Sequence, residues 1–163
     1  MISNKMQEAI SQHISAEFYS AYLYLSMSAH CENLMFKGFG RWLRVQYQEE
    51  LKHATKMIDY LLERGARPSF QPIPTPPADF RGVLDVFEGV LAHERQVTTL
   101  VHNLFQLASA EQDHATQVFL QWFVAEQVEE EARALEIVEK LKMVFDRPAS
   151  ILYLDKEFGK RSS

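Results

Sequence analysis

Residues 38–65, GFGRWLRVQYQEELKHATKMIDYLLERG, contain the pattern that decides the fold. From Leu43 to Leu61, apolar and small side chains recur at alternating steps of four and three residues, which is the spacing of one face of an α-helix. The final glycine is typical of a helix C-terminus, so we expect a helix over about residues 38–64. The same stripe contains Glu50, a carboxylate that is costly to bury unless a cation accompanies it.

Three further segments repeat the spacing of a helix with one apolar face. Ser3 is suited to cap the first of them, and Pro148 favours the start of a short fifth helix. The additional helices are expected at about residues 4–33, 80–109, 113–145 and 148–158. We therefore predict an all-α protein, a four-helix bundle over about residues 4–145 with a short terminal helix, in a single domain over residues 1–163.

The connection between the second and third helices has a different composition. Residues 66–79, ARPSFQPIPTPPAD, hold five of the six prolines and cannot form a regular helix. About 14 extended residues span roughly 46 Å, enough to travel the ~40 Å length of the preceding helix. Antiparallel neighbours in a bundle need only about 2–8 residues, so this length predicts a crossover that makes the second and third helices parallel.

Each long helix places one glutamate in its apolar stripe: Glu17, Glu50, Glu94 and Glu130. With the predicted crossover, all four lie within about 6 Å of one height along the bundle. An up-down-up-down arrangement would also bring them close, so the heights support a site more than they support the crossover. Four carboxylates that meet inside one bundle need cations, and a metal site is the simplest explanation.

Glu50 and His53 form an E-x-x-H pair, whose spacing puts a carboxylate and an imidazole on one helix face. Carboxylates with one imidazole suit iron or manganese, and the set is too rich in oxygen for a structural zinc site. A dinuclear centre results if Glu50 is shared between two ions. Glu17 and His53 would then bind one ion, and Glu94 and Glu130 the other. Such a centre could bind two Fe(II) ions and pass electrons to O₂.

These residues resemble the ferroxidase centre of the non-haem ferritins, particularly the bacterial type, and the resemblance covers essentially the whole chain. It rests on Glu17, the Glu50–His53 motif, Glu94 and the run EQVEE at residues 126–130. The resemblance implies a ferritin-like bundle that assembles into a homo-oligomeric cage of 24 subunits. It also implies an iron storage protein with ferroxidase activity, which oxidises Fe(II) with O₂ or peroxide at a di-iron centre and deposits a ferric mineral inside the cage.

The same resemblance implies roles for further residues. Tyr24 corresponds to the tyrosine beside the di-iron centre, and Gln127 to the glutamine near the second iron. The implied catalytic residues are Glu17, Glu50, His53, Glu94, Glu130, Tyr24 and Gln127. A third iron position would be formed by Glu49, Glu126, Glu129 and Glu130. The alternative for the last set is a solvated acidic helix face.

This sequence lacks residues that are characteristic of two related families, the bacterioferritins and the rubrerythrins. Bacterioferritins carry a second E-x-x-H on the fourth helix, where this chain has Gln127 and Glu130, and a haem-ligating methionine where it has Leu51, so no haem is expected. The single cysteine, Cys31, excludes the cysteine-rich iron module of rubrerythrins. The remaining histidines are expected to have ordinary surface or packing roles: His13, His30, His93, His102 and His114.

Composition limits the partners and the compartment. A net charge of −5 argues against nucleic-acid binding through bulk electrostatics and is compatible with attracting cations. No stretch approaches the ~18 apolar residues of a membrane span, and residues 1–13 contain no apolar signal core. One cysteine fits a reducing cytosol. We therefore expect a cytoplasmic protein without nucleic-acid or membrane partners.

Two other functions stay open at this point. A di-iron or di-manganese oxidase or catalase would keep its metals as a permanent cofactor, and the second E-x-x-H expected of such an enzyme is absent from this sequence. An inert structural cage subunit would store mineral without oxidising iron. The intact set of Glu17, Glu50, His53 and Glu94 argues against it.

Overall fold

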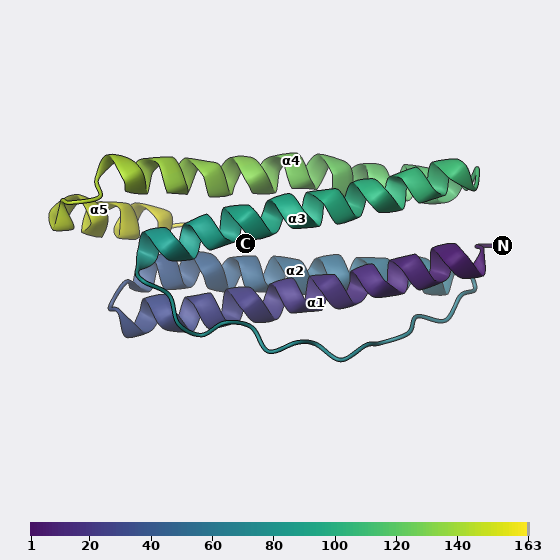
Figure 1. The fold of residues 1–163 in the computed structure, drawn as a ribbon, viewed down its shortest axis with the longest axis horizontal. Helices are drawn as coiled ribbons and strands as arrows, with labels where there is room; N and C mark the ends of the chain where they lie inside the picture. The colour runs from purple at the N-terminus through teal and green to yellow at the C-terminus, as the bar shows by residue number, and fades with distance from the viewer. Residues whose placement is uncertain (163) are drawn as a thin grey trace.

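The computed structural model describes residues 1–162, which fold into five α-helices without a strand in that range (Figure 1). The helices are α1 (Asn4–Asn33), α2 (Lys37–Glu63), α3 (Val83–Ala110), α4 (His114–Met143) and α5 (Pro148–Phe158). The four long helices lie side by side, and α5 packs at one end of the bundle against α2 and α4. The predicted all-α bundle with a short terminal helix is confirmed. No helix in the described part of the chain is long and apolar enough to cross a membrane.

The helix ends follow local chemistry. The Ser3 hydroxyl accepts a hydrogen bond from the Met6 amide at 3.0 Å, so it caps α1 as predicted. Gly65 follows α2 with a φ of 70°, a left-handed conformation that glycine adopts without strain. By contrast, α3 begins three residues later than expected. The Asp85 carboxylate accepts the Arg81 amide at 2.9 Å, which satisfies this donor ahead of the first helical turn.

A long extended connection joins α2 to α3 and runs outside the bundle along its length, beside α1 (Figure 1). It is hydrogen-bonded to α1 at several points. The Ser26 hydroxyl donates to the Pro77 carbonyl at 2.7 Å, and the Ser69 amide donates to the Ser11 hydroxyl at 3.2 Å. Because of this connection, α2 and α3 run in the same direction, whereas α1–α2 and α3–α4 are antiparallel hairpins. The predicted crossover is confirmed.

Two apolar clusters fill the bundle, one toward each end. The cluster nearer α5 includes Phe39 and Phe87, and the other includes Met57 and Leu120. Along every long helix, buried polar side chains fall between the two clusters: Glu17, Gln46, Glu50, His53, Glu94, Gln127 and Glu130. The middle of the bundle is therefore a polar layer enclosed by two apolar ones.

Candidate metal centre

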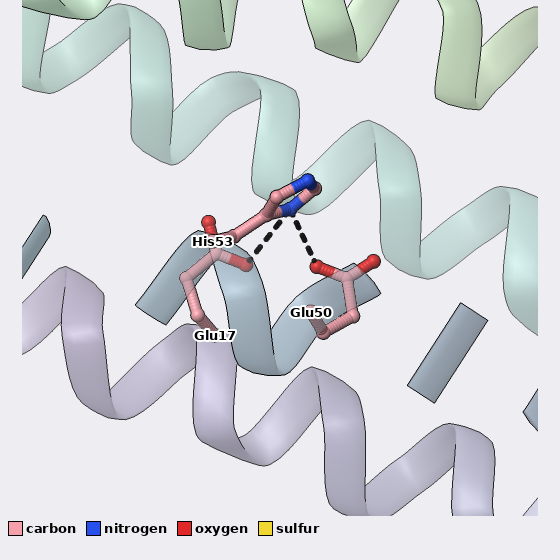
Figure 2. A group of neighbouring side chains, drawn as sticks. All are labelled: Glu17, Glu50 and His53. Carbon is pink, nitrogen blue, oxygen red and sulfur yellow. Dashed lines mark hydrogen bonds and ion pairs between the residues drawn. The ribbon is translucent and has the colours of Figure 1, made fainter. Parts of the chain in front are cut away.

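The α1–α2 hairpin contributes one half of this polar layer. Figure 2 shows Glu50 and His53 projecting from α2 toward Glu17 of α1. The Nδ1 atom of His53 lies 3.0 Å from Oε2 of Glu50 and 4.0 Å from Oε2 of Glu17. One ligand atom from each of the three residues falls within 4.8 Å of the other two, close enough to hold a metal ion. All three side chains are buried.

The α3–α4 hairpin contributes Glu94 from α3 and Gln127 and Glu130 from α4, all buried. The Gln127 amide donates to Oε2 of Glu94 at 3.1 Å and to its backbone carbonyl at 3.2 Å. The Gln46 amide of α2 connects the two hairpins, because it donates to Oε1 of Glu50 at 2.9 Å and to Oε2 of Glu130 at 2.7 Å. The four glutamates predicted to meet therefore lie around one interior space.

Tyr24 is also part of this layer. Its side chain is fully buried on α1, and its hydroxyl donates to the Glu94 carboxylate. Burial, together with the negative charge of Glu94, raises the pKa of Tyr24 well above its ordinary value. The phenol therefore stays protonated and remains a donor.

Sequence reasoning missed two residues that contact the glutamates. His13 is packed inside the bundle, within the roles expected of it, but it also contacts a predicted ligand: this side chain is 4% exposed and its Nε2 lies 2.8 Å from Oε1 of Glu17. No role was predicted for Gln46 from the sequence. Both residues lie four positions before the glutamate they contact, a spacing that puts them on the same helix face. That spacing was the available signal. The Nε2 atom of His93 lies 2.7 Å from the Ser20 hydroxyl, which fits the ordinary packing role expected of this histidine.

Burial and mutual repulsion shift the proton affinity of the α3–α4 glutamates. Burial, reinforced by the charge of Glu50, raises the pKa of Glu94 to about 8. Burial, reinforced by the charge of Glu94, raises the pKa of Glu130 to about 7 against the hydrogen bond from Gln46. A cation that enters this half must therefore displace protons.

The α1–α2 half is balanced differently. Burial raises the pKa of Glu50 to about 8, although the hydrogen bond from His53 opposes it. Burial also opposes a charged His53, but the hydrogen bond to Glu50 and the charges of Glu50 and Glu17 raise its pKa to about 9. For Glu17, burial is outweighed by the His13 imidazole beside it, so the pKa is lowered. This half thus contains a carboxylate that stays ionised.

The donor atoms fit a cation. Among residues 1–162, Oε2 of Glu17 and Oε1 of Glu130 are buried carboxylate oxygens without a hydrogen-bond donor. Unpaired buried acceptors are rare and costly, and a metal ion between the hairpins would satisfy both. Carboxylate oxygens with one imidazole nitrogen suit Fe(II) or Mn(II) rather than a thiolate-seeking metal. The arrangement can therefore hold redox-active divalent ions.

The predicted third iron position has a mixed environment. Glu126 approaches Glu130 and His53 closely enough for one ligand atom of each to lie within 4.8 Å of the others. Glu49 and Glu129 instead form ion pairs with arginine side chains. Arg133 also lies 3.5 Å from Oε1 of Glu130, so three of the four predicted ligands already have a cationic group beside them.

A cleft of about 650 Å³ opens beside His53, between α2 and α4. Trp122 forms one wall and meets the His53 ring edge-on, with 5.5 Å between ring centroids. The Lys56 ammonium lies 4.4 Å from the centre of the Trp122 ring. Acidic side chains, including Glu49 and Glu126, line the same cleft. The cleft offers small ions a polar approach to the centre.

Comparison with known proteins agrees with this geometry. Residues 7–144 match the family model described as the ferritin-like domain. A bacterial non-heme ferritin of Bacteroides fragilis is 48% identical over 161 residues, covering 99% of this chain and 100% of that protein. One from Staphylococcus saprophyticus is 36% identical over 162 residues, covering 99% and 97%.

The structural comparison gives the same family. An open pore ferritin from the hyperthermophilic archaeon Archaeoglobus fulgidus superposes with a TM-score of 0.99 at 50% identity, covering 99% of this chain and 100% of that one. An engineered closed form of the same ferritin superposes with a TM-score of 0.98 at 51% identity, covering 99% of both chains.

Proposed function

The chain belongs to the ferritin family, and we propose on this premise that it oxidises Fe(II) at the centre between its two hairpins. Its membership of the family supports a role in iron storage. The ligands in this proposal are Glu17, Glu50, His53, Glu94 and Glu130. The observation that carries it is the pair of buried carboxylate oxygens, one from each hairpin, that have no donor in residues 1–162. The cationic groups beside them, His53 Nδ1 at 4.0 Å from Glu17 and Arg133 Nη1 at 3.5 Å from Glu130, make no hydrogen bond with these oxygens, which leaves both available to a transient divalent ion.

The chemistry assigned to the site starts from Fe(II) as substrate. Glu17 and His53 bind one ion, Glu94 and Glu130 bind a second, and Glu50 bridges the two. Because the pKa values of Glu50 and Glu94 are raised to about 8, their protons leave as the ions enter. Two Fe(II) ions supply the two electrons that, with two protons, reduce O₂ to hydrogen peroxide. Peroxide as oxidant takes two electrons and two protons and gives water.

Tyr24 and Gln127 position Glu94 in this scheme. Both donate hydrogen bonds to its carboxylate, so they hold one orientation while the carboxylate binds an ion. Gln127 also stands where a further carboxylate would bind the second ion more tightly, and we assign the ready departure of ferric product to this neutral residue. In Gln127→Glu, repeated turnover should slow and mineral release should fall. Unchanged turnover and release would show that this account is wrong.

The assembly part of the proposal rests on the family. We propose a homo-oligomeric cage of 24 subunits that stores a ferric mineral in its interior, with the third iron position formed by Glu49, Glu126, Glu129 and Glu130. The cleft beside His53, with its acidic lining, is the route we assign to ions that leave or reach the centre. The cytoplasm stays the predicted compartment.

Aerobic titration tests the proposal against a permanent dinuclear cofactor. Metal-free protein would receive a large excess of Fe(II), followed by size-exclusion chromatography with iron and protein quantified in each fraction. Iron that co-elutes with a cage-sized particle, far above about two ions per chain, supports storage behind a centre that turns over. Saturation at about two ions per chain would refute storage and favour a di-iron or di-manganese oxidase or catalase. A particle that fills with iron but oxidises it no faster than buffer would indicate an inert cage subunit.

A further inference from the structure

Two arginines contact the carboxylates of the predicted third iron position. Arg161, three residues beyond the end of α5, places Nη2 2.6 Å from Oε2 of Glu49. Its guanidinium lies over the Trp42 ring, 4.3 Å from the ring centre, and the side chain is only 13% exposed. An ion pair and a cation–π contact at a largely buried site hold this side chain firmly.

Arg133 reaches the same carboxylates from α4. Its Nη2 lies 2.9 Å from Oε2 of Glu129, and its Nη1 lies 3.5 Å from Oε1 of Glu130 and 3.7 Å from Oε2 of Glu49. One guanidinium therefore touches three of the four predicted ligands. The side chain is 38% exposed, and exposed ion pairs are individually weak, so it can leave more easily than Arg161.

The packing of α5 against α2 positions Arg161. Helix α5 runs from the end of the bundle back toward its middle, and the residues that follow it continue in that direction (Figure 1). The position of α5 is fixed where it meets α2, because the Asp155 carboxylate accepts the Phe39 amide at 2.8 Å. Gly38 permits this approach, since a Cβ at that position would lie 1.7 Å from the Asp155 carbonyl oxygen. Arg161 therefore reaches the centre from a defined anchor.

The charges explain what the arginines do. Two guanidiniums carry a charge of +2, the same as one Fe(II) ion, and they neutralise carboxylates that would otherwise repel one another. We propose that Arg133 and Arg161 are the resident counter-ions of the third iron position, and that iron binds there only by displacing Arg133. The proposal rests on the proposed function, and it makes Arg133 the residue that sets the affinity of this position.

The position is half open for such an exchange. On one side, Glu126 presents a ligand atom within 4.8 Å of ligand atoms of Glu130 and His53, and Arg133 lies 3.5 Å from Oε1 of Glu130 without a hydrogen bond to it. On the other side, Glu49 and Glu129 are held by the arginines. A third ion can therefore make contact before Arg133 leaves, but it completes its ligand set only afterward. Weak retention follows, so iron passes through this position instead of remaining there.

The test is an anaerobic Fe(II) titration of the assembled, metal-free protein by calorimetry at pH 7, for wild type, Arg133→Gln and Arg95→Gln. Arg95 is a matched control because it is an exposed arginine at the same level, paired with Glu131 on another side of α4. In Arg133→Gln, the binding step that follows the first two ions should tighten about tenfold, as loss of a nearby charge predicts. The first two steps should change by less than about twofold, and Arg95→Gln should match wild type.

Three results would overturn the proposal. They are an unchanged or absent third step in Arg133→Gln, an equal change in Arg95→Gln, or a loosened third step. If Arg133→Gln does not assemble, Arg133→Lys serves instead. Lysine keeps the charge but does not bridge several carboxylates as guanidinium does, so the third step should tighten by a smaller factor. Failure of the di-iron proposal would show separately, as loss of the first two steps in the wild type.

Discussion

The two hairpins contribute unequally to the centre. The α1–α2 hairpin supplies Glu17, Glu50 and His53, with ligand atoms already within 4.8 Å of one another and the only imidazole among the predicted ligands. The α3–α4 hairpin supplies Glu94 and Glu130, both with raised pKa values and both engaged by neutral donors. Both halves release protons when a cation enters, but the α1–α2 half alone contains a carboxylate, Glu17, whose pKa is lowered, so one of its ligands is already ionised. The difference shows that the two ions can bind with different affinities. It predicts that the α1–α2 half binds the first ion.

Replacing Glu50, the ligand shared by both ions, should impair both halves of the centre and so remove the difference between them. Glu50→Gln takes a carboxylate from both halves, so the initial rate of Fe(II) oxidation should fall by at least about 100-fold, beyond the 10–100-fold typical of outer partners. Stopped-flow absorbance after mixing Fe(II) with aerobic protein measures this rate. Glu8→Gln, an exposed change on α1 away from the cleft, should oxidise iron at the wild-type rate. A loss of less than threefold in Glu50→Gln would refute the proposed centre.

A change confined to the α3–α4 half should increase the difference in ion affinity between the two halves. Glu94→Gln removes a ligand of the second ion only, so we expect second-ion binding to weaken about 30-fold while the first changes by less than about threefold. Anaerobic calorimetry separates the two steps. Glu88→Gln supplies the control, since Glu88 is exposed on α3. Equal weakening of both steps would contradict the division into halves.

Substitution of His13 should weaken ion binding in the α1–α2 half by a smaller factor. His13→Leu removes the partner of Glu17 at 2.8 Å, so binding of the first ion should weaken about tenfold. His13→Gln retains a donor and should recover most of the affinity, which a purely structural role would not explain. Co(II) absorption under titration reports the first ion. Wild-type Co(II) binding by His13→Leu would argue against positioning by this residue.

The metal-free protein should lose stability as pH rises. The pKa values of Glu50 and Glu94 are raised from 4.5 to about 8, and that of Glu130 to about 7. The folded chain therefore binds more protons than the unfolded chain between pH 4.5 and 8, and stability present below this window is lost through it. His53, raised from 6.5 to about 9, acts in the same direction, whereas the lowered pKa of Glu17 matters only below 4.5.

Calorimetry of chelator-treated protein checks this dependence. We expect the melting temperature to fall by at least about 5 °C between pH 6 and pH 9, since even about 2 kcal/mol of lost stability corresponds to about 4–8 °C at this chain size. Protein loaded with a redox-inert divalent ion should show the opposite trend, because protons then compete with the metal. A melting temperature of the metal-free protein that rises across this range would contradict the buried protonated carboxylates.

Much of this arrangement could be predicted from the sequence because burial follows helical periodicity. The stripe that contains Leu43 and Leu61 also contains Glu50, so the polar layer was foreseeable, and so was the crossover from the length of its proline-rich segment. Contacts between distant segments were not. Arg161 meets Glu49 across 112 positions of sequence, and no local pattern encodes that meeting. His13 lay within reach of prediction, but a histidine four positions from a glutamate also occurs on solvated helix faces.

The connection beside α1 has a consequence for how the protein opens and closes. It carries little of the core, and each hairpin it joins is built from contacts that are local in sequence, which form quickly. Ions bound across the hairpins would act as non-covalent cross-links between two rapidly formed units, and would favour the docked state by mass action. A protease that cuts the connection should therefore let the halves of the metal-free subunit separate far sooner than those of the loaded one.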